Sequence, residues 1–471
     1  MPFPPPSDRG PNPAALRSPL GRLLRGAALA LCVVLGGLGA AAAGRAARDP
    51  AGPYKKLDVF SHVLSLIENL YVENVDETRL LYGAIDGMVR TLDPHSSFME
   101  PRSYAALKEE TDGEYGGVGL ELSLRDGEVV VVSPLDDTPA AHAGFAPGDR
   151  IVEIDGQPMR GLKESDAAHA LTGPPGTTCV VKALRAGWEA PRAFTLVRDV
   201  IRVVSVEDRL YDRKYGYVKL KSFSERTDAY LKRALDHLRA QSGGELKGLV
   251  LDLRRNPGGL LDQAVKVADR FLRSGIIVTT KGRGGRHVEV ERAHARDTEP
   301  GYPLVVLVDG GTASASEIVA GALQDHGRGL ILGTQTFGKG SVQQVIELDD
   351  GSGLKLTTAR YYTPSGKSIQ ERGISPDLLV RASKTAGTDE DAVREKSLPN
   401  HFHGEGMEVE ASKADAASAA SPPPQLPSLP KAPGDPEDDV QLKAALDALR
   451  TWPAVRSQIK ERGRNSASAT P

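Results

Sequence analysis

Two uninterrupted aliphatic runs constrain the fold of this chain more than any other feature. "KGLVLDLR" occupies residues 247–254, and "PLVVLVD" occupies residues 303–309. Short runs of this kind predict strands that are buried on both faces, as in a parallel sheet. A helical pattern follows each run: "LDQAVKVADRFL" after the first and "SASEIVAGALQDHG" after the second. This alternation, from about Ile201 to residue 382, predicts an α/β core with active groups where strands meet loops.

The segment from Gly113 to about Arg198 has a different pattern, of short strands separated by turns. Its strands are expected in "GGVGLELSL", "GEVVVVSPL", "DRIVEI" and "TTCVVKAL", with helices in "DDTPAAHAG" and "LKESDAAHAL". This order closely resembles a PDZ domain. In such a domain the backbone amides of a glycine loop bind a terminal carboxylate while the next strand pairs with the peptide. The candidate peptide-binding residues are therefore Gly117, Val118, Gly119 and Leu120, although the glycines alone would predict only a turn.

The N-terminal segment has the pattern of an export signal. Arg17, Arg22 and Arg25 precede an uncharged run, Gly26–Gly44, that ends in small residues. We interpret residues 1–44 as a cleaved signal or, alternatively, as a retained membrane anchor; its Ala and Gly content favours the signal. Either way we expect an exported protein, periplasmic or membrane-anchored. Cys32 lies in this run without a lipobox-like neighbourhood, and Cys179 is expected in a buried strand.

Helices are predicted on both sides of the two domains. Residues 54–110 carry two apolar stripes at helical spacing, and the segment 436–462 contains an amphipathic helix in "DDVQLKAALDAL". Residues 384–435, rich in Ala, Ser, Pro, Asp and Glu, are interpreted as a linker. His401 and His403 fall in this linker, and no further ligand lies near them in the sequence. We therefore interpret them as solvated and expect no metal site.

The stretch "GTQTFGKGSVQQ", Gly333–Gln344, raises the possibility of a nucleotide site. It matches all but the last position of the phosphate-binding pattern G-x-x-x-x-G-K-[ST]. Gly340 stands where the magnesium-binding Ser or Thr is required, and "SVQQVIEL" predicts a strand where that pattern needs a helix. The nucleotide hypothesis therefore fails. The formal charge of −3 also gives no global basic field for nucleic acid.

Lys339 can instead serve as a catalytic base for a serine. Ser314 stands at a helix start, where unpaired amides and the helix dipole favour an oxyanion. The simpler interpretation of Ser314 and Glu317 is a capping box, S-x-x-E. Burial can lower a lysine pKa from about 10.4 by about 3 to 5 units, which yields a base near neutral pH. No G-x-S-x-G elbow is present, and neither His95 nor His326 lies in a triad-like motif.

The serine and lysine motifs together resemble one family. "GTASASEIVAGALQDHGRGLILGTQTFGKGSVQ" is similar to the carboxyl-terminal processing (tail-specific) serine peptidases, as is "DLRRNPGG" at Asp252–Gly259. The similarity extends from about Tyr54 to Leu379. It implies a Clp-protease/crotonase-like core with an inserted PDZ domain and N-terminal helices. It also implies Ser314 as nucleophile, Lys339 as base, Gln343 as the residue that orients the lysine, and Gly259 and Ala315 as oxyanion-hole amides.

The resemblance implies an exported endopeptidase that captures exposed C-terminal tails and requires no metal or cofactor. We expect a homodimer or larger assembly joined through the helices of residues 54–110, with the Asp438–Leu449 helix as a further contact. An adaptor or lipoprotein partner is compatible with this function. The alternative is a PDZ scaffold or chaperone with a degenerate peptidase core. A trypsin-like PDZ protease needs a His/Asp/Ser set that is not evident here.

Overall fold

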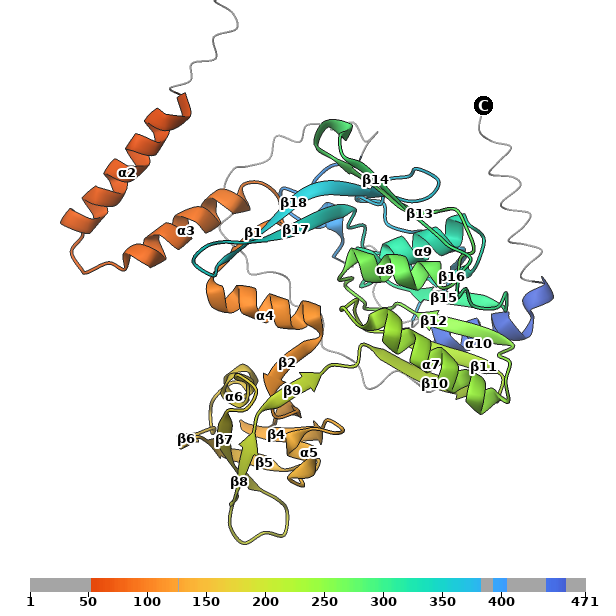
Figure 1. Cartoon of the computed structure of the whole chain (residues 1–471), viewed down its shortest axis with the longest axis horizontal. Coiled ribbons are helices and arrows are strands. Elements are labelled where there is room, and N and C mark those ends of the chain that lie inside the picture. Colours follow the sequence, from red (N-terminus) through yellow and green to blue (C-terminus); the bar gives the residue numbers. More distant parts are fainter. Residues whose placement is uncertain (1–51, 126, 383–392, 405–437, 455–471) are drawn as a thin grey trace, which may run out of the picture. The chain divides into compact units, whose positions relative to one another are not determined.

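The computed structural model describes residues 52–125, 127–382, 393–404 and 438–454 (Figure 1). The expected export signal and most of the expected linker lie outside the described residues. In the described ranges, every helix is too short or too polar to cross a membrane. The chain divides into two compact units, residues 1–81 and 82–471.

The described part of the first unit is helical, as predicted. It consists of α2 (Gly52–Leu70) and the first turn of α3 (Glu77–Arg90). Helix α2 exposes an apolar set to solvent: Leu57, Val59, Phe60, Val63, Leu66 and Leu70. The predicted self-association through these helices stays a prediction.

The core of the second unit is a six-stranded sheet in the order β10-β11-β12-β15-β16-β19 (Figure 1). Strands β10 and β11 are antiparallel, and the remaining neighbours are parallel. The two aliphatic runs form β12 and β15, both fully buried, which confirms the predicted central strands. The bounds are β10 Val206–Tyr211, β11 Tyr215–Leu220, β12 Gly248–Asp252, β15 Leu304–Val308, β16 Leu330–Gly333 and β19 Leu378–Leu379.

Helices cover both faces of this sheet because alternate residues of a strand point to opposite faces. In β12, Leu249 and Leu251 join the cluster under the helices α7, α8 and α9, whereas Val250 joins the cluster under α10. The bounds of these helices are α7 Thr227–Ser242, α8 Leu261–Asp269, α9 Ala315–Asp325 and α10 Val440–Arg450.

Helix α10 packs on the core of its own chain. Its apolar face, which includes Leu442, Leu446 and Leu449, is buried against β12, β15 and β16. Asp439 caps the helix and accepts two hydrogen bonds from Arg254 Nη1 and Nη2, at 2.9 and 2.8 Å. The expectation that this helix contributes to a dimer contact is wrong for its apolar face, because the intramolecular sheet already buries that face.

A second sheet has five strands. Its hydrogen-bonded neighbours follow the spatial order β1-β18-β13-β14, with β17 also paired to β18. Strand β17 follows Lys339 directly, which confirms the strand expected there. The bounds are β1 Ser97–Met99, β13 Ile276–Gly282, β14 Val288–Arg292, β17 Ser341–Glu347 and β18 Gly353–Tyr362, with the short helix η1 at Arg283–Gly285.

The inserted domain follows α4 (Pro101–Asp112) and forms the predicted small β-sheet with two helices. Strands β2 (Glu114–Gly117) and β9 (Asp199–Arg202) pair where the chain enters and leaves it. Cys179 is buried in β7, as expected. The other bounds are β3 Leu120–Arg125, β4 Glu128–Pro134, α5 Pro139–His142, β5 Arg150–Ile154, β6 Gln157–Pro158, α6 Glu164–Leu171, β7 Thr178–Leu184 and β8 Arg192–Val197.

Residues 393–404 differ from the expected linker. They contain the short helix η3 (Glu395–Ser397), and Glu395 is fully buried. Its carboxylate contacts His95 Nε2 at 2.7 Å and accepts a hydrogen bond from Gln370 Nε2 at 2.8 Å. These polar contacts with residues distant in sequence fix the position of residues 393–404, although their composition is typical of a linker.

Candidate active site

Ser314 lies at a sharp strand-to-helix turn. It follows β15 by a short loop and immediately precedes α9. Its backbone has φ +54° and ψ −116°, a region that a residue with a Cβ adopts only under strain. Such strain is common where a nucleophile must be presented from a turn. The sequence lacks the G-x-S-x-G signature, so this elbow-like geometry could not be found from the motif.

Glu317 connects the serine turn to the lysine loop. Its Oε2 accepts hydrogen bonds from the backbone amides of Ser314 at 2.8 Å and Lys339 at 2.9 Å. Its Oε1 accepts from the Thr336 hydroxyl at 2.6 Å and the Gly338 amide at 2.8 Å. Because both carboxylate oxygens are occupied, Glu317 does more than cap the helix, the role that its spacing from Ser314 predicted.

Burial raises the Glu317 pKa from its ordinary value to about 7, although the four hydrogen bonds oppose this shift. The carboxyl group is fully buried. The ionised form is the one that accepts from all four donors. The hydrogen bonds that join the serine turn to the lysine loop therefore depend on the negative charge of Glu317.

The glycines that flank Lys339 are required by the close approach of another backbone segment. A Cβ at Gly340 would lie 2.4 Å from the Gln370 nitrogen, and Gly338, with φ +97°, has no room beside Glu371. The Glu371 amide donates to the Gly338 carbonyl at 2.8 Å, and the Gly340 amide donates to Gln370 Oε1 at 3.0 Å. The expected confinement of Lys339 is thus a property of the fold.

Burial, together with the nearby positive charge of Lys355, lowers the Lys339 pKa to about 8. The carboxylates of Glu395, Glu317 and Asp93 act in the opposite direction. Because desolvation is the largest of these effects, the neutral amine is accessible near neutral pH.

Tyr361 is a site residue that the sequence analysis missed. It lies on β18, is buried, and makes a side-chain hydrogen bond with Ser314. Burial raises its pKa to about 12, so it remains a neutral phenol. Among the described residues, no hydrogen bond joins the Ser314 hydroxyl to the Lys339 amine. Catalytic hydrogen bonds are often formed only when substrate binds, so this geometry does not argue against the pair.

The loop after β12 packs directly on the serine turn. A Cβ at Gly258 would lie 2.9 Å from Ser314 Cβ and 3.0 Å from the Ala315 nitrogen. Buried Asn256 fixes this arrangement: its carbonyl accepts from the Ala313 amide at 3.0 Å and the Ser316 hydroxyl at 3.1 Å. Ala315 is the first residue of α9, where an amide has no partner inside the helix.

Gly259 follows Gly258 in the same loop, with φ +136°. A Cβ there would lie 2.2 Å from the Phe223 carbonyl oxygen, so only glycine fits this position. The assignment of its amide, with that of Ala315, to an oxyanion hole stays a prediction.

In the part of the chain that the structure describes, the Gln343 side chain makes its hydrogen bonds to residues other than Lys339. Its Nε2 donates to Ser341 Oγ at 2.9 Å and Thr357 Oγ1 at 3.3 Å. Thr357 in turn donates to Asp93, one of the carboxylates that act on the Lys339 pKa. The role of Gln343 in orienting the lysine therefore stays a prediction.

A pocket of about 360 Å³ lies between β3 and α6 of the inserted domain. Three of the four predicted peptide-binding residues, Val118, Gly119 and Leu120, line it. Gly117 is not among the lining residues and ends β2, where it pairs with Asp199. Gly119 has φ +76°, and a Cβ there would lie 2.4 Å from Thr138, so the loop requires this glycine.

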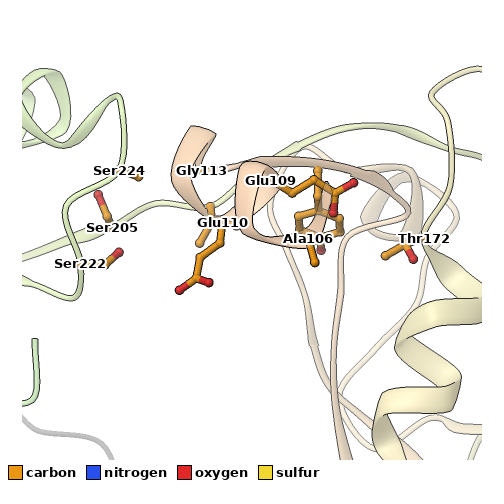
Figure 2. Close-up of a pocket in the computed structure, with 10 residues that line it drawn as sticks. Ala106, Glu109, Glu110, Gly113, Thr172, Ser205, Ser222 and Ser224 are labelled. Atoms are coloured by element: carbon orange, nitrogen blue, oxygen red, sulfur yellow. The ribbon is translucent and has the colours of Figure 1, made fainter. Parts of the chain in front are cut away.

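A second pocket, of about 250 Å³, lies where the inserted domain joins the core (Figure 2). Glu109, Glu110 and Gly113 at the end of α4 line it, as do serines of the core-side loops. These serines are Ser205, Ser222 and Ser224. The two strands that connect the domain to the core thus run beside a hollow.

Comparison with known proteins identifies three matching regions. Residues 214–380 match the model of peptidase family S41, residues 40–103 match the activating protease CtpB N-terminal domain, and residues 116–190 match a PDZ domain. A carboxy-terminal-processing protease of Bartonella bacilliformis is 43% identical over 401 residues, which cover 84% of this chain and 89% of that protein. The chain belongs to peptidase family S41.

A second relative agrees with this assignment. The carboxy-terminal processing protease CtpB of Bacillus subtilis is 34% identical, over 69% of this chain and 68% of that protein. A solved photosystem II D1 C-terminal processing protease is 33% identical over 72% of this chain and 97% of its own, with a TM-score of 0.41. The family matches and the two relatives show that this S41 peptidase is a carboxy-terminal processing serine protease with a PDZ domain, as the sequence analysis predicted.

Proposed function

We propose that this S41 peptidase cleaves proteins near exposed C-terminal tails, with Ser314 as nucleophile and Lys339 as general base. The observation that carries this proposal is the single carboxylate oxygen of Glu317 that accepts the backbone amides of both residues, at 2.8 and 2.9 Å. Residues 25 positions apart in sequence are thereby held side by side. The lowered Lys339 pKa supports its role as the base.

In the proposed reaction, neutral Lys339 accepts the hydroxyl proton of Ser314 as Oγ bonds to the carbonyl carbon of the scissile peptide bond. The amides of Gly259 and Ala315 donate to the oxyanion that forms. The lysine then protonates the leaving amine as the C–N bond breaks. Water, deprotonated by Lys339, hydrolyses the acyl ester and releases Ser314.

A serine-directed fluorophosphonate probe tests the nucleophile directly. We expect one covalent adduct per chain, located on Ser314 by peptide mapping. Labelling should be slowed strongly by Lys339→Ala, because the base is needed to activate the hydroxyl. An adduct on Ser316 or on another residue would overturn the assignment. The scaffold alternative predicts no adduct at all.

The pH dependence tests the base. Only neutral Lys339 accepts a proton, so kcat/KM should rise about tenfold per pH unit below the pKa of about 8 and level off above it. The measurement is kcat/KM from pH 6 to 9.5 with a peptide that lacks ionisable side chains. A rate that is flat across pH 7 to 9 would contradict a lysine base.

We further propose that the PDZ groove holds the free carboxylate of the substrate tail. Backbone amides next to Gly119 are expected to bind the carboxylate, and β3 is expected to pair with the tail. Movement of the PDZ domain about the β2–β9 pair would then expose or cover the serine turn. The hollow lined by Glu110 and Ser222 gives space for such a movement. A bound tail can favour one position only through its differential affinity.

Paired peptides test this capture. An amidated tail should show a KM about tenfold to a hundredfold higher than the free acid, with kcat unchanged, because charge-assisted hydrogen bonds are lost. Gly119→Trp should remove the difference between the two peptides. Arg150→Ala is the matched control: Arg150 pairs with Glu128 across β4 and β5, and both side chains are substantially exposed. Equal KM values for both peptides in the wild type would rule out carboxylate capture.

Localisation and assembly complete the proposal. The basic and apolar N-terminal segment supports export, with residues 1–44 as signal or anchor. The exposed apolar residues of α2, among them Phe60 and Leu66, support self-association through the first unit. Light scattering of the purified protein at micromolar concentration tests this, and a monomer would refute it. An adaptor or lipoprotein that delivers the substrate is compatible with a PDZ-dependent enzyme.

A further inference from the structure

Two histidines and a glutamate converge on the segment that packs against the lysine loop. Glu371 Oε1 lies 2.6 Å from His401 Nε2 and 3.2 Å from His403 Nδ1. The three possible ligand atoms all lie within 4.8 Å of one another. The sequence placed no further ligand near the histidines, but the fold supplies Glu371 from 30 positions earlier.

The chain conformation brings both imidazoles to one side. Residues 401–404 have no helical or sheet structure, and the rings of His401 and His403 lie with their centroids 5.1 Å apart, both facing the same Glu371 oxygen. Phe402, between the histidines, instead lies under the Arg360 guanidinium, 5.4 Å from its ring centroid. The Phe402 carbonyl accepts from Gln370 Nε2 at 2.9 Å, which fixes this segment against the loop that carries Glu371.

Neighbouring groups orient the atoms that a cation would need. His401 Nδ1 lies 2.7 Å from the Leu398 carbonyl oxygen, which only accepts, so Nδ1 carries the hydrogen. Glu371 Oε2 accepts the Gly404 amide at 2.7 Å, which leaves Oε1 toward both rings. A backbone carbonyl that orients an imidazole, and a hydrogen bond to the second carboxylate oxygen, are the usual supports of metal ligands.

The ligand atoms face one another closely. His401 Nε2 lies 2.6 Å from Glu371 Oε1, and with the hydrogen on Nδ1 the lone pair of Nε2 can be offered to a metal cation. The second imidazole, His403, is aimed at the same oxygen, and its side chain is 55% exposed, so a cation has access from solvent.

We propose that Glu371 Oε1, His401 Nε2 and His403 Nδ1 form a Zn²⁺ site in which water supplies the fourth ligand. Two imidazoles and one carboxylate are a donor set that suits tetrahedral zinc, with bonds of about 2.0 to 2.2 Å. The contact between Glu371 and His401 would need to lengthen slightly to admit the ion. Protons and zinc compete for the same nitrogen atoms, so binding weakens at acidic pH.

The site is connected to the lysine loop through one backbone–backbone hydrogen bond and one hydrogen bond from a backbone amide to a side chain. The Glu371 amide donates to the Gly338 carbonyl, and Gln370 Oε1 accepts the Gly340 amide, so these bonds lie on either side of Lys339. A cation that ties residues 398–404 to Glu371 therefore stabilises the backbone around Lys339. Zinc binding itself does not depend on the proposed catalytic role of this lysine.

Zinc titration of the full chain, purified without a histidine tag, tests the site. We expect one Zn²⁺ per chain by calorimetry and by elemental analysis after dialysis. Affinity should fall at least tenfold in His401→Ala, His403→Ala and Glu371→Gln. His403→Ala is the most informative variant, because this exposed side chain is the least needed for folding. His294→Ala is the matched control: it removes an exposed histidine that pairs with one carboxylate, that of Asp269.

Hydrogen exchange gives a second readout. Zinc should slow amide exchange in peptides that cover residues 337–341 and 368–373 of the wild type and leave them unchanged in His403→Ala. The proposal is overturned if the wild type binds no zinc, if the three variants bind it as the wild type does, or if His294→Ala weakens binding equally. If zinc slows exchange in His403→Ala as much as in the wild type, the ion is bound elsewhere.

Discussion

Ser314→Ala lowers kcat/KM for a tailed protein substrate by roughly 10³- to 10⁶-fold, the range seen when one member of a catalytic unit is removed. Lys339→Ala should lose a similar factor, because an unactivated serine hydroxyl is a weak nucleophile. The double variant should be little worse than either single variant, since the two groups act in one step. Lys339→Arg should be equally inactive, because arginine does not deprotonate in this pH range.

The control for this experiment is Ser316→Ala. Ser316 is buried two residues beyond Ser314, and its hydroxyl donates to the Asn256 carbonyl at 3.1 Å. Its loss should cost about 1 kcal/mol of stability while the rate stays within about tenfold of the wild type. Near-wild-type hydrolysis by Ser314→Ala would remove Ser314 as nucleophile and make Ser316 the candidate. Circular dichroism and thermal unfolding confirm that each variant is folded.

The second large loss of activity is expected from Glu317→Gln. An amide group has only one acceptor oxygen, so its NH₂ must face two of the four donors that the carboxylate now satisfies. Each buried donor left without a partner costs about 1 to 3 kcal/mol. Because two of these donors are the amides of Ser314 and Lys339, we expect kcat to fall by roughly a hundredfold or more while KM changes little.

Two further measurements separate positioning from a general loss of stability. The negative charge of Glu317 raises the Lys339 pKa, so removing it should move the rising limb of the pH–rate profile to lower pH. Glu299→Gln is the matched control, because Glu299 is also a buried carboxylate, bonded to Arg239 and Tyr302 away from the site. It should lower thermal stability without changing kcat. A Glu317→Gln variant with normal kcat and an unshifted profile would show that Glu317 has only a structural role.

The sequence predicted the parts of this protein that depend on local pattern. The aliphatic runs at β12 and β15, the strand after Lys339 and the order of elements in the PDZ domain are all visible in residue periodicity. The glycines beside Lys339 indicated confinement, although the segment responsible, at Gln370 and Glu371, could not be identified from spacing.

The features that were missed arise from contacts between distant segments. Tyr361 approaches Ser314 from β18, and Asn256 joins two loops through one backbone carbonyl. Asn256 lies within the DLRRNPGG motif, but the motif does not indicate its bonds to the serine turn, and Tyr361 lies in no motif identified from the sequence. Glu317 was visible only as a capping residue, since its bonds to Gly338 and Lys339 exist only once β16 places that loop beside α9. The same holds for Glu371 and the two histidines.

Helix α10 has a consequence for the order in which the protein matures. It packs on β12, β15 and β16, on the face of the core sheet that carries Val250, Val305 and Leu307. It is also bonded, through Asp439, to Arg254 in the loop that continues to Gly258 and Gly259 beside the serine turn. A chain still on the ribosome lacks this helix until residue 450 has been synthesised. A nascent enzyme therefore has an unfinished core and an untethered loop, and the proteolytic activity proposed here would develop only after α10 has been synthesised.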